Sequence, residues 1–150
     1  MAHSYTSCLY HCVFSTKGRR QLIPADVQPQ LWPYIGGIAR ANEFTARAVG
    51  GTADHVHVLM SLPATLPIAK AVQLVKAGSS KWLRESFPML REFAWQEGYG
   101  AFSIGVAQLA DTVRYIENQA AHHRMHSFED EYRAFLERNA IEFDERHVFG

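Results

Sequence analysis

Apolar and polar residues alternate regularly between residues 55 and 62. The apolar positions are Val56, Val58, Met60 and Leu62, and the positions between them are His55, His57, Leu59 and Ser61. Side chains on a strand point to opposite faces in turn, so the pattern predicts a strand whose apolar set faces a core. Both imidazoles then leave from the other face, two residues apart.

Residues 109–126 repeat with the period of a helix instead. The apolar stripe is Leu109, Val113, Ile116 and Ala120, and the stripe beside it is Tyr115, Gln119, His122 and His126. This spacing predicts an amphipathic helix. Residues four apart on a helix are neighbours, so the Tyr115 phenol and the Gln119 amide should point the same way.

The remaining segments complete an ordered series of elements. Their patterns predict strands near 5–16 and 44–50, helices over about 30–42 and 67–86, and a broken strand over 92–104. A last helix should begin after Ser127, with Asp130 in a capping-box arrangement. Pro29 and Pro33 are expected to confine the first helix, because proline is tolerated only in a first turn.

The predicted order is βαββαβ followed by further helices, which is the ferredoxin-like (RRM-like) arrangement of an α+β protein. In that arrangement two helices cover one face of an antiparallel sheet. His55 and His57 then lie on the face that these helices leave uncovered, and the helix that carries Tyr115 can lie across it. The fold therefore predicts that the two motifs meet.

Length and composition fit one domain over residues 1–150. The chain is 47% hydrophobic and 20% charged, which is typical of a globular protein. No apolar run approaches the ~20 residues of a membrane span, and the amino terminus lacks a signal-peptide pattern. We therefore expect a cytoplasmic protein with no membrane contact.

Two cysteines, Cys8 and Cys12, fall on one face of the first predicted strand. Their spacing places them about 13 Å apart, which is beyond the reach of a disulfide. Their register with Tyr10 and Phe14 favours a buried strand face over a zinc site that would also use His11.

Charge is distributed unevenly, although the net charge is zero. Residues 1–126 carry 12 Lys and Arg against 8 Asp and Glu, and residues 127–150 carry 3 against 7. An acidic tail therefore accompanies a mildly basic body. The candidate phosphate contacts are Lys17, Arg19 and Arg20 after the first strand and Lys70, Lys81 and Arg84 on the second helix. Binding through them should weaken with salt, although such charges also occur as ordinary solvated surface.

Two strand histidines, or a tyrosine and a glutamine on a helix face, are each common without special chemistry. Together they suggest one site. The imidazoles of His55 and His57 and the amide oxygen of Gln119 can hold Mg²⁺ or Mn²⁺ and leave coordination positions for phosphate oxygens. Tyr115 can then act as a nucleophile. His122, one turn beyond Gln119, is a candidate proton acceptor, or else a histidine that favours the helix dipole.

Both motifs resemble those of a known family. HVHVLMSLP (55–63) resembles the HUH motif, in which a bulky apolar residue separates two histidines. YIENQAAHH (115–123) resembles the single-tyrosine motif of the small insertion-sequence transposases that act on single-stranded DNA, to which REP-associated tyrosine transposases are related. The resemblance extends over nearly the whole chain, as far as FEDEYRAFLERNAIEFDER at 128–146.

This resemblance implies a metal-dependent DNA transposase with Tyr115 as its nucleophile. Such an enzyme cleaves and rejoins single-stranded DNA ends through a 5′-phosphotyrosine and recognises DNA hairpins near those ends. The resemblance also implies a homodimer in which the tyrosine helix of one subunit completes the metal site of the other. Whether Tyr115 serves its own subunit or the partner's is left open.

Three other functions stay open as well. A domesticated relative would process host repeat hairpins by the same chemistry. A metal-dependent phosphodiesterase would use His55 and His57 to activate water, with Tyr115 only lining the site. A non-catalytic binder of single-stranded nucleic acid would stack bases on the sheet.

Overall fold

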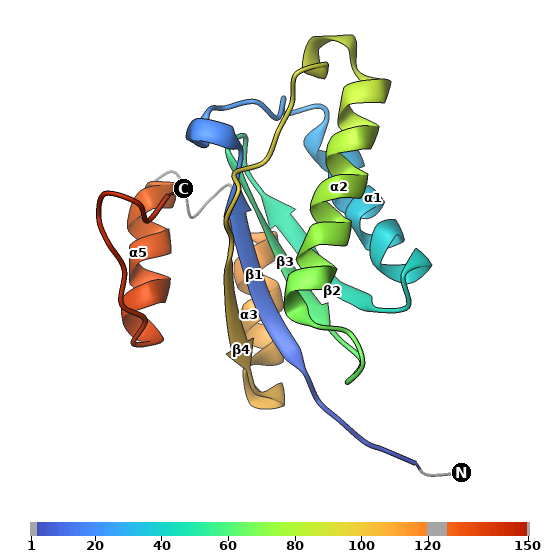
Figure 1. The fold of residues 1–150 in the computed structure, drawn as a ribbon, viewed down its shortest axis with the longest axis vertical. Helices are drawn as coiled ribbons and strands as arrows, with labels where there is room; N and C mark the ends of the chain where they lie inside the picture. Colours follow the sequence, from blue (N-terminus) through green and yellow to red (C-terminus); the bar gives the residue numbers. More distant parts are fainter. Residues whose placement is uncertain (1–2, 120–125, 150) are drawn as a thin grey trace.

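The structure is a computed structural model that describes residues 3–119 and 126–149, and its centre is a four-stranded sheet (Figure 1). The strands are β1 (Leu9–Ser15), β2 (Thr45–Gly51), β3 (His55–Ser61) and β4 (Gly100–Ile104). The helices are α1 (Gln28–Ala41), α2 (Ile68–Ser86), α3 (Leu109–Glu117) and α5 (Phe128–Arg138). Short 3₁₀ turns lie at Lys17–Arg19, Pro88–Leu90 and Val106–Gln108.

All neighbouring strands are antiparallel, in the order β2-β3-β1-β4. This is the predicted ferredoxin-like arrangement, and that prediction is confirmed. Figure 1 shows α1 and α2 on one side of the sheet and α3 and α5 on the other. Among the described helices, none combines the length and the apolar character that crossing a bilayer requires.

The main core lies between the sheet and the pair α1 and α2. The apolar set predicted for the histidine strand is buried there, namely Val56, Val58, Met60 and Leu62. Full burial of each such side chain contributes roughly 1.5–3 kcal/mol. Cys12 lies in the same core, and both Cys8 and Cys12 are free thiols, as predicted.

The opposite face of the sheet is covered as well. Leu59 of β3 packs with Ile116 of α3, and Val13 of β1 packs with Phe135 of α5. Because both faces are covered, six of the seven residues of β3 are buried. The histidine strand is therefore a central strand between two helical layers.

The first helix differs from its prediction at one proline. Pro29 lies in the first turn, as expected, but α1 continues through Pro33. The predicted helix, about 30–42, held Pro33 within its first turn. Because α1 begins at Gln28, Pro33 lies beyond the first turn, and the expectation that proline is confined to that turn was wrong. Pro33 costs the helix one backbone hydrogen bond, and the burial of Leu31, Ile35 and Ala39 against the sheet offsets that loss.

Two other predicted elements have the expected form. The broken strand consists of an isolated bridge between Trp95 and Thr16, followed by β4. Ser127 is the N-cap of α5, and its hydroxyl accepts a hydrogen bond from the backbone N–H of Asp130 at 3.2 Å. The cap fixes where α5 begins, and so which of its residues face the sheet.

The backbone of α3 lies directly on β2 at Gly50, which pairs with His57 of β3. A Cβ atom at Gly50 would lie 2.4 Å from the carbonyl oxygen of Ile116, closer than van der Waals contact permits. Ile116 follows Tyr115 in the chain. The absent side chain of Gly50 therefore lets α3 hold Tyr115 close to the sheet.

We expect Gly50→Ala to destabilise the protein by about 1–3 kcal/mol, because α3 must move away from β2. The midpoint of urea unfolding measures this change. Gly98→Ala is the matched control, since a Cβ there meets only the Gln96 side chain at 3.8 Å. Equal midpoints for Gly50→Ala and Gly98→Ala would contradict the close approach.

Candidate active site

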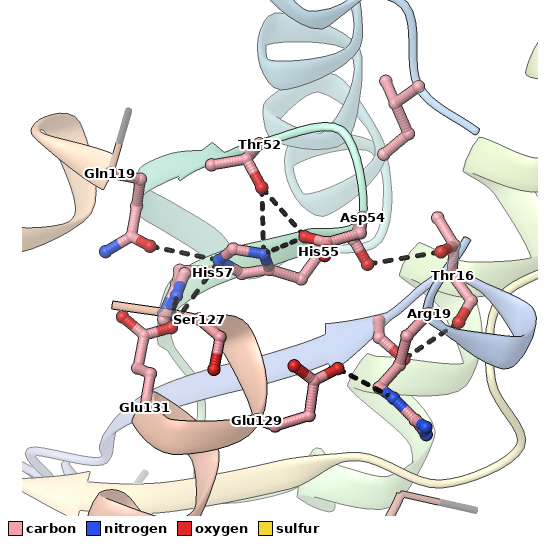
Figure 2. Close-up of polar contacts among 12 residues, drawn as sticks. Thr16, Arg19, Thr52, Asp54, His55, His57, Gln119, Ser127, Glu129 and Glu131 are labelled. Atoms are coloured by element: carbon pink, nitrogen blue, oxygen red, sulfur yellow. Dashed lines mark hydrogen bonds and ion pairs between the residues drawn. The ribbon is translucent and has the colours of Figure 1, made fainter. Parts of the chain in front are cut away.

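His55 and His57 lie on β3, and both side chains are fully buried (Figure 2). The prediction that both imidazoles leave one face, opposite the main core, is confirmed. That face is not exposed, because α3 and α5 pack over it. The two Nε2 atoms converge on one carboxylate oxygen, Oε1 of Glu131, at 2.9 Å from His57 and 3.6 Å from His55.

Glu131 comes from the first turn of α5 and is also buried. The candidate ligand atoms of His55, His57 and Glu131 all lie within 4.8 Å of one another, a group that could hold a metal ion. Glu131 was not among the site residues predicted from the sequence. A signal was present, because position 131 falls on the apolar stripe of α5 with Phe128 and Phe135, where a charged residue is unusual.

Gln119 lies just beyond the end of α3, and its side chain is buried beside the histidines. Its Oε1 atom is 3.1 Å from His55 Nε2. Its amide nitrogen donates to the backbone carbonyl of Tyr115 at 3.2 Å, which orients the oxygen toward the imidazole. The structure thus brings together the two histidines and the glutamine, as the sequence analysis expected.

The other ring nitrogen of His55, Nδ1, lies 2.7 Å from the carboxylate of Asp54 (Figure 2). A proton shared with Asp54 leaves Nε2 with a lone pair that faces the oxygens of Gln119 and Glu131. His55 Nε2 and these oxygens are then all hydrogen-bond acceptors, and buried acceptors this close together require a proton or a cation between them. Two imidazoles, a carboxylate and an amide oxygen are a donor set that suits a divalent cation such as Mg²⁺ or Mn²⁺.

His57 also has a partner on its other ring nitrogen. His57 Nδ1 is 2.7 Å from Nε2 of His11, a buried residue of β1. Burial, and then the neighbouring His57, lower the pKa of His11 to about 3, so this imidazole is neutral at pH 7. His11 was not among the site residues predicted from the sequence.

Tyr115 lies beside this group, on α3. Its hydroxyl donates a hydrogen bond to Oε2 of Glu131, the carboxylate oxygen that does not face His57. Its ring contacts His57 edge-on, with ring centroids 5.7 Å apart. Burial, and then the hydrogen bond and negative charge of Glu131, raise the pKa of the Tyr115 hydroxyl, while Gln119 and then Arg138 oppose that rise.

Two hollows open beside Tyr115, between α3 and α5. Their volumes are about 300 Å³ and about 210 Å³. His11 lines the first, Glu131 lines the second, and Tyr115 and Arg138 line both. A larger hollow of about 380 Å³ lies between α2 and residues 94–99, but none of the groups described above contributes to it.

The predicted phosphate contacts lie in two separate places. Lys17 and Arg19 lie in the 3₁₀ turn that follows β1, and Arg20 comes directly after it. Within this first group, Arg19 pairs with Glu129 of α5 at 2.8 Å (Figure 2). The second group lies on α2, the helical layer on the far side of the sheet from Tyr115, and comprises Lys70, Lys81 and Arg84.

The candidate proton acceptor His122 lies outside the described residues. The described groups offer Tyr115 another acceptor, the carboxylate of Glu131.

Comparisons with known proteins identify relatives. The chain matches the family described as Transposase IS200 like over residues 4–119. It is 28% identical over 123 residues to the transposase for insertion sequence element IS200 of Salmonella typhimurium, covering 77% of this chain and 80% of that protein. It is 26% identical over 115 residues to the ISDra2 transposase TnpA of Deinococcus radiodurans, covering 73% of this chain and 82% of that protein.

Solved structures share the fold. One is described as a candidate transposase from Deinococcus radiodurans R1, with a TM-score of 0.65, 26% identity, and coverage of 79% of this chain and 96% of that one. Another is a REP-associated tyrosine transposase bound to a REP hairpin, with a TM-score of 0.60, 17% identity, and coverage of 82% of this chain and 73% of that one. The family match covers most of the chain, so the protein belongs to the IS200-like transposase family.

Proposed function

We propose that the protein cleaves and rejoins single-stranded DNA, with Tyr115 as the nucleophile and a divalent cation as cofactor. The observation that carries the proposal is the position of the Glu131 carboxylate. One of its oxygens faces the imidazole of His57, and the other accepts the hydrogen bond of the Tyr115 hydroxyl. A single side chain therefore joins the candidate cation site to the candidate nucleophile.

The cation would be held by His55, His57 and Glu131, with the amide oxygen of Gln119 as a further protein ligand. We propose Mg²⁺ or Mn²⁺, which accept a mixture of oxygen and imidazole ligands. When bound, the ion would polarise the phosphate oxygens and offset the negative charge that develops during the displacement.

In the cleavage step, the Tyr115 oxygen attacks the phosphorus of a phosphodiester. The bond between this oxygen and phosphorus forms, and the bond from phosphorus to the 3′ oxygen breaks. The phenol proton passes to the Glu131 carboxylate, its hydrogen-bond partner, and the departing oxygen takes a proton to become a 3′-hydroxyl. The 5′ side of the DNA stays attached to the protein as a phosphotyrosine.

Rejoining is the reverse displacement with a different strand end. A 3′-hydroxyl attacks the phosphotyrosine, a new phosphodiester forms, and Tyr115 regains its proton. Each step exchanges one phosphate ester for another, so the strand can be resealed without ATP. This property favours strand transfer over degradation as the purpose of a tyrosine nucleophile.

We propose that Tyr115 acts within its own subunit and that the substrate is single-stranded DNA with a hairpin near its end. The contacts of Tyr115 with Glu131 and His57 of the same chain support action in its own subunit. The substrate proposal is supported by family membership and by the REP hairpin bound to a relative of the same fold.

We also propose a homodimer, since joining two DNA ends calls for two tyrosines.

The experiment uses end-labelled, hairpin-containing single-stranded DNA from the region that flanks the gene. With Mn²⁺ or Mg²⁺ we expect a protein–DNA band that survives denaturation and disappears with EDTA. Cleavage that leaves a free 5′-phosphate and no covalent band would favour the phosphodiesterase. Binding that needs no metal, without any cleavage, would favour the non-catalytic binder.

The two hollows beside Tyr115 suggest the path of the DNA strand. Tyr115 and Arg138 line both of them, so a strand that runs from one hollow to the other passes both residues. The Arg138 guanidinium lies over the Phe135 ring, 5.1 Å from its centroid. Among residues 3–119 and 126–149, no carboxylate forms an ion pair with Arg138. We propose that Arg138 contacts a phosphate next to the cleavage position.

We therefore expect Arg138→Gln to weaken binding of single-stranded DNA and to lower the salt dependence by one phosphate contact. The slope of log K against log salt concentration should fall in magnitude by about 0.7. Fluorescence anisotropy in EDTA, across a range of salt concentrations, measures this slope. Arg133→Gln, on the same helix, is the control, because Arg133 is already paired with Glu145 at 3.1 Å. Equal slopes for the two variants would contradict the role of Arg138.

A further inference from the structure

We propose that His11 is a positioning residue that keeps its hydrogen bond to His57 whichever ring nitrogen of His57 carries the proton. The inference rests on the proposed cation site and goes beyond it, because His11 is not itself a ligand in that proposal. The pairing of the strands brings the two imidazoles together. Val13 of β1 pairs with His57, and His11 lies two residues away on the same face of β1.

The hydrogen bond between His11 and His57 lies in a closely packed, buried environment. His11 Nε2 and His57 Nδ1 are 2.7 Å apart, and both side chains are buried. Phe135 holds the His11 ring from one side, edge to face, with ring centroids 4.9 Å apart. Two ring nitrogens at this distance share one proton, so one ring donates and the other accepts.

The position of that proton decides whether His57 can bind a cation. In the first arrangement His11 Nε2 donates, and His57 then carries its own proton on Nε2 and donates to Glu131 Oε1 at 2.9 Å. In the second arrangement His57 donates from Nδ1 to His11, and the lone pair of His57 Nε2 is available to a cation. His11 then carries its proton on Nδ1.

Both rings stay neutral in both arrangements, and the pair holds two protons throughout. If a cation occupies the site, His57 would lose the proton on Nε2 and His11 would gain one on Nδ1 through exchange with solvent, without net release from the pair. His11 lines the hollow of about 300 Å³ beside Tyr115, so the pair lies next to a space that solvent can enter.

The contrast with His55 explains why an imidazole suits this position. The partner of His55 Nδ1 is the carboxylate of Asp54, an acceptor that favours a proton on that nitrogen. His11 can donate or accept at the same atom. His57 can therefore pair with Glu131 before the cation arrives and bind the cation afterwards, with its partner retained in both states.

Nitrogen-15 NMR of labelled protein tests the proposal. In the metal-free protein we expect a coupling between His11 Nε2 and His57 Nδ1 across the hydrogen bond, with the His57 proton on Nε2. Titration with Mg²⁺ should move that proton to Nδ1 while the His55 proton stays on Nδ1. A His57 proton on the same nitrogen with and without Mg²⁺, or the absence of the coupling, would overturn the proposal.

Metal affinity gives a second readout. We expect His11→Leu to weaken Mn²⁺ binding about 10- to 100-fold, and His11→Gln, whose amide can donate or accept, to restore most of it. Circular dichroism checks that both variants fold. Wild-type affinity in a folded His11→Leu protein would overturn the role of His11. If the wild type binds no Mn²⁺, the cation proposal fails, and the coupling in the metal-free protein still tests the contact of the two rings.

Discussion

Replacing Tyr115 with phenylalanine should lower the rate of covalent protein–DNA formation by at least about 10³-fold. Phenylalanine retains the ring that packs against His57 and lacks only the oxygen that forms the bond to phosphorus. The fold and the affinity for DNA should therefore persist. The measurement is the amount of denaturation-resistant product formed with time, at saturating Mn²⁺.

Tyr132→Phe is the matched control for this substitution. Tyr132 is a buried tyrosine of α5, which lies on the same side of the sheet as α3, and its variant loses the same hydroxyl group. We expect it to form the covalent product at the wild-type rate. Full cleavage by Tyr115→Phe would assign the nucleophile to water and would support the phosphodiesterase.

The parts of the site with strong local periodicity could be predicted from the sequence. The alternation around His55 identifies the strand, its face and the core on the other side. The helical spacing of Tyr115 and Gln119 predicts that their side chains point the same way, and the structure places Tyr115 on α3 and Gln119 just beyond its end. Their position beside the histidines could be predicted from the order of the elements. Two helices cover one face of the antiparallel sheet, so the later helices can pack on the other face, where the histidines lie.

Glu131 and His11 could not be predicted in the same way, because their roles depend on contacts between distant elements. Glu131 lies 74 residues from His57 in the chain, and His11 lies 46 residues from it. The alternation of the first strand puts His11 on the face opposite Cys12, and the pattern of the last helix draws attention to its apolar residues and its cap rather than to Glu131. Only the packing of α5 and the pairing of β1 with β3 turn these positions toward the site.

Candidate contacts to DNA are also hard to predict from the sequence, because charge counts along the chain do not show which residues lie near the site. Counting basic residues along the chain grouped those of α2 with those near the first strand as candidate phosphate contacts. The structure separates them, because α2 covers the other face of the sheet. Arg138 lies in the acidic part of the chain, where a regional count of charges conceals it, although it borders both hollows beside Tyr115.

Replacing Glu131 with glutamine should weaken Mn²⁺ binding by about 100-fold or more and should lower covalent product formation with it. The variant keeps the size of the side chain but removes the negative charge that faces both imidazoles. Gln119→Ala removes a neutral ligand and should weaken binding by only about tenfold. Titration calorimetry of the purified protein with Mn²⁺ measures both affinities.

Glu129→Gln controls for the loss of one negative charge from the same helical turn. Glu129 is paired with Arg19 and does not belong to the histidine–glutamate group, so Mn²⁺ affinity should be unchanged. If Gln119→Ala weakens Mn²⁺ binding more than Glu131→Gln does, the third protein ligand is the Gln119 amide oxygen rather than the Glu131 carboxylate. Glu131 would then serve only Tyr115, as the acceptor of its proton, and the Glu131→Gln protein would bind Mn²⁺ normally while forming product slowly. Affinity and product formation measured on the same three variants therefore separate the two roles of the carboxylate.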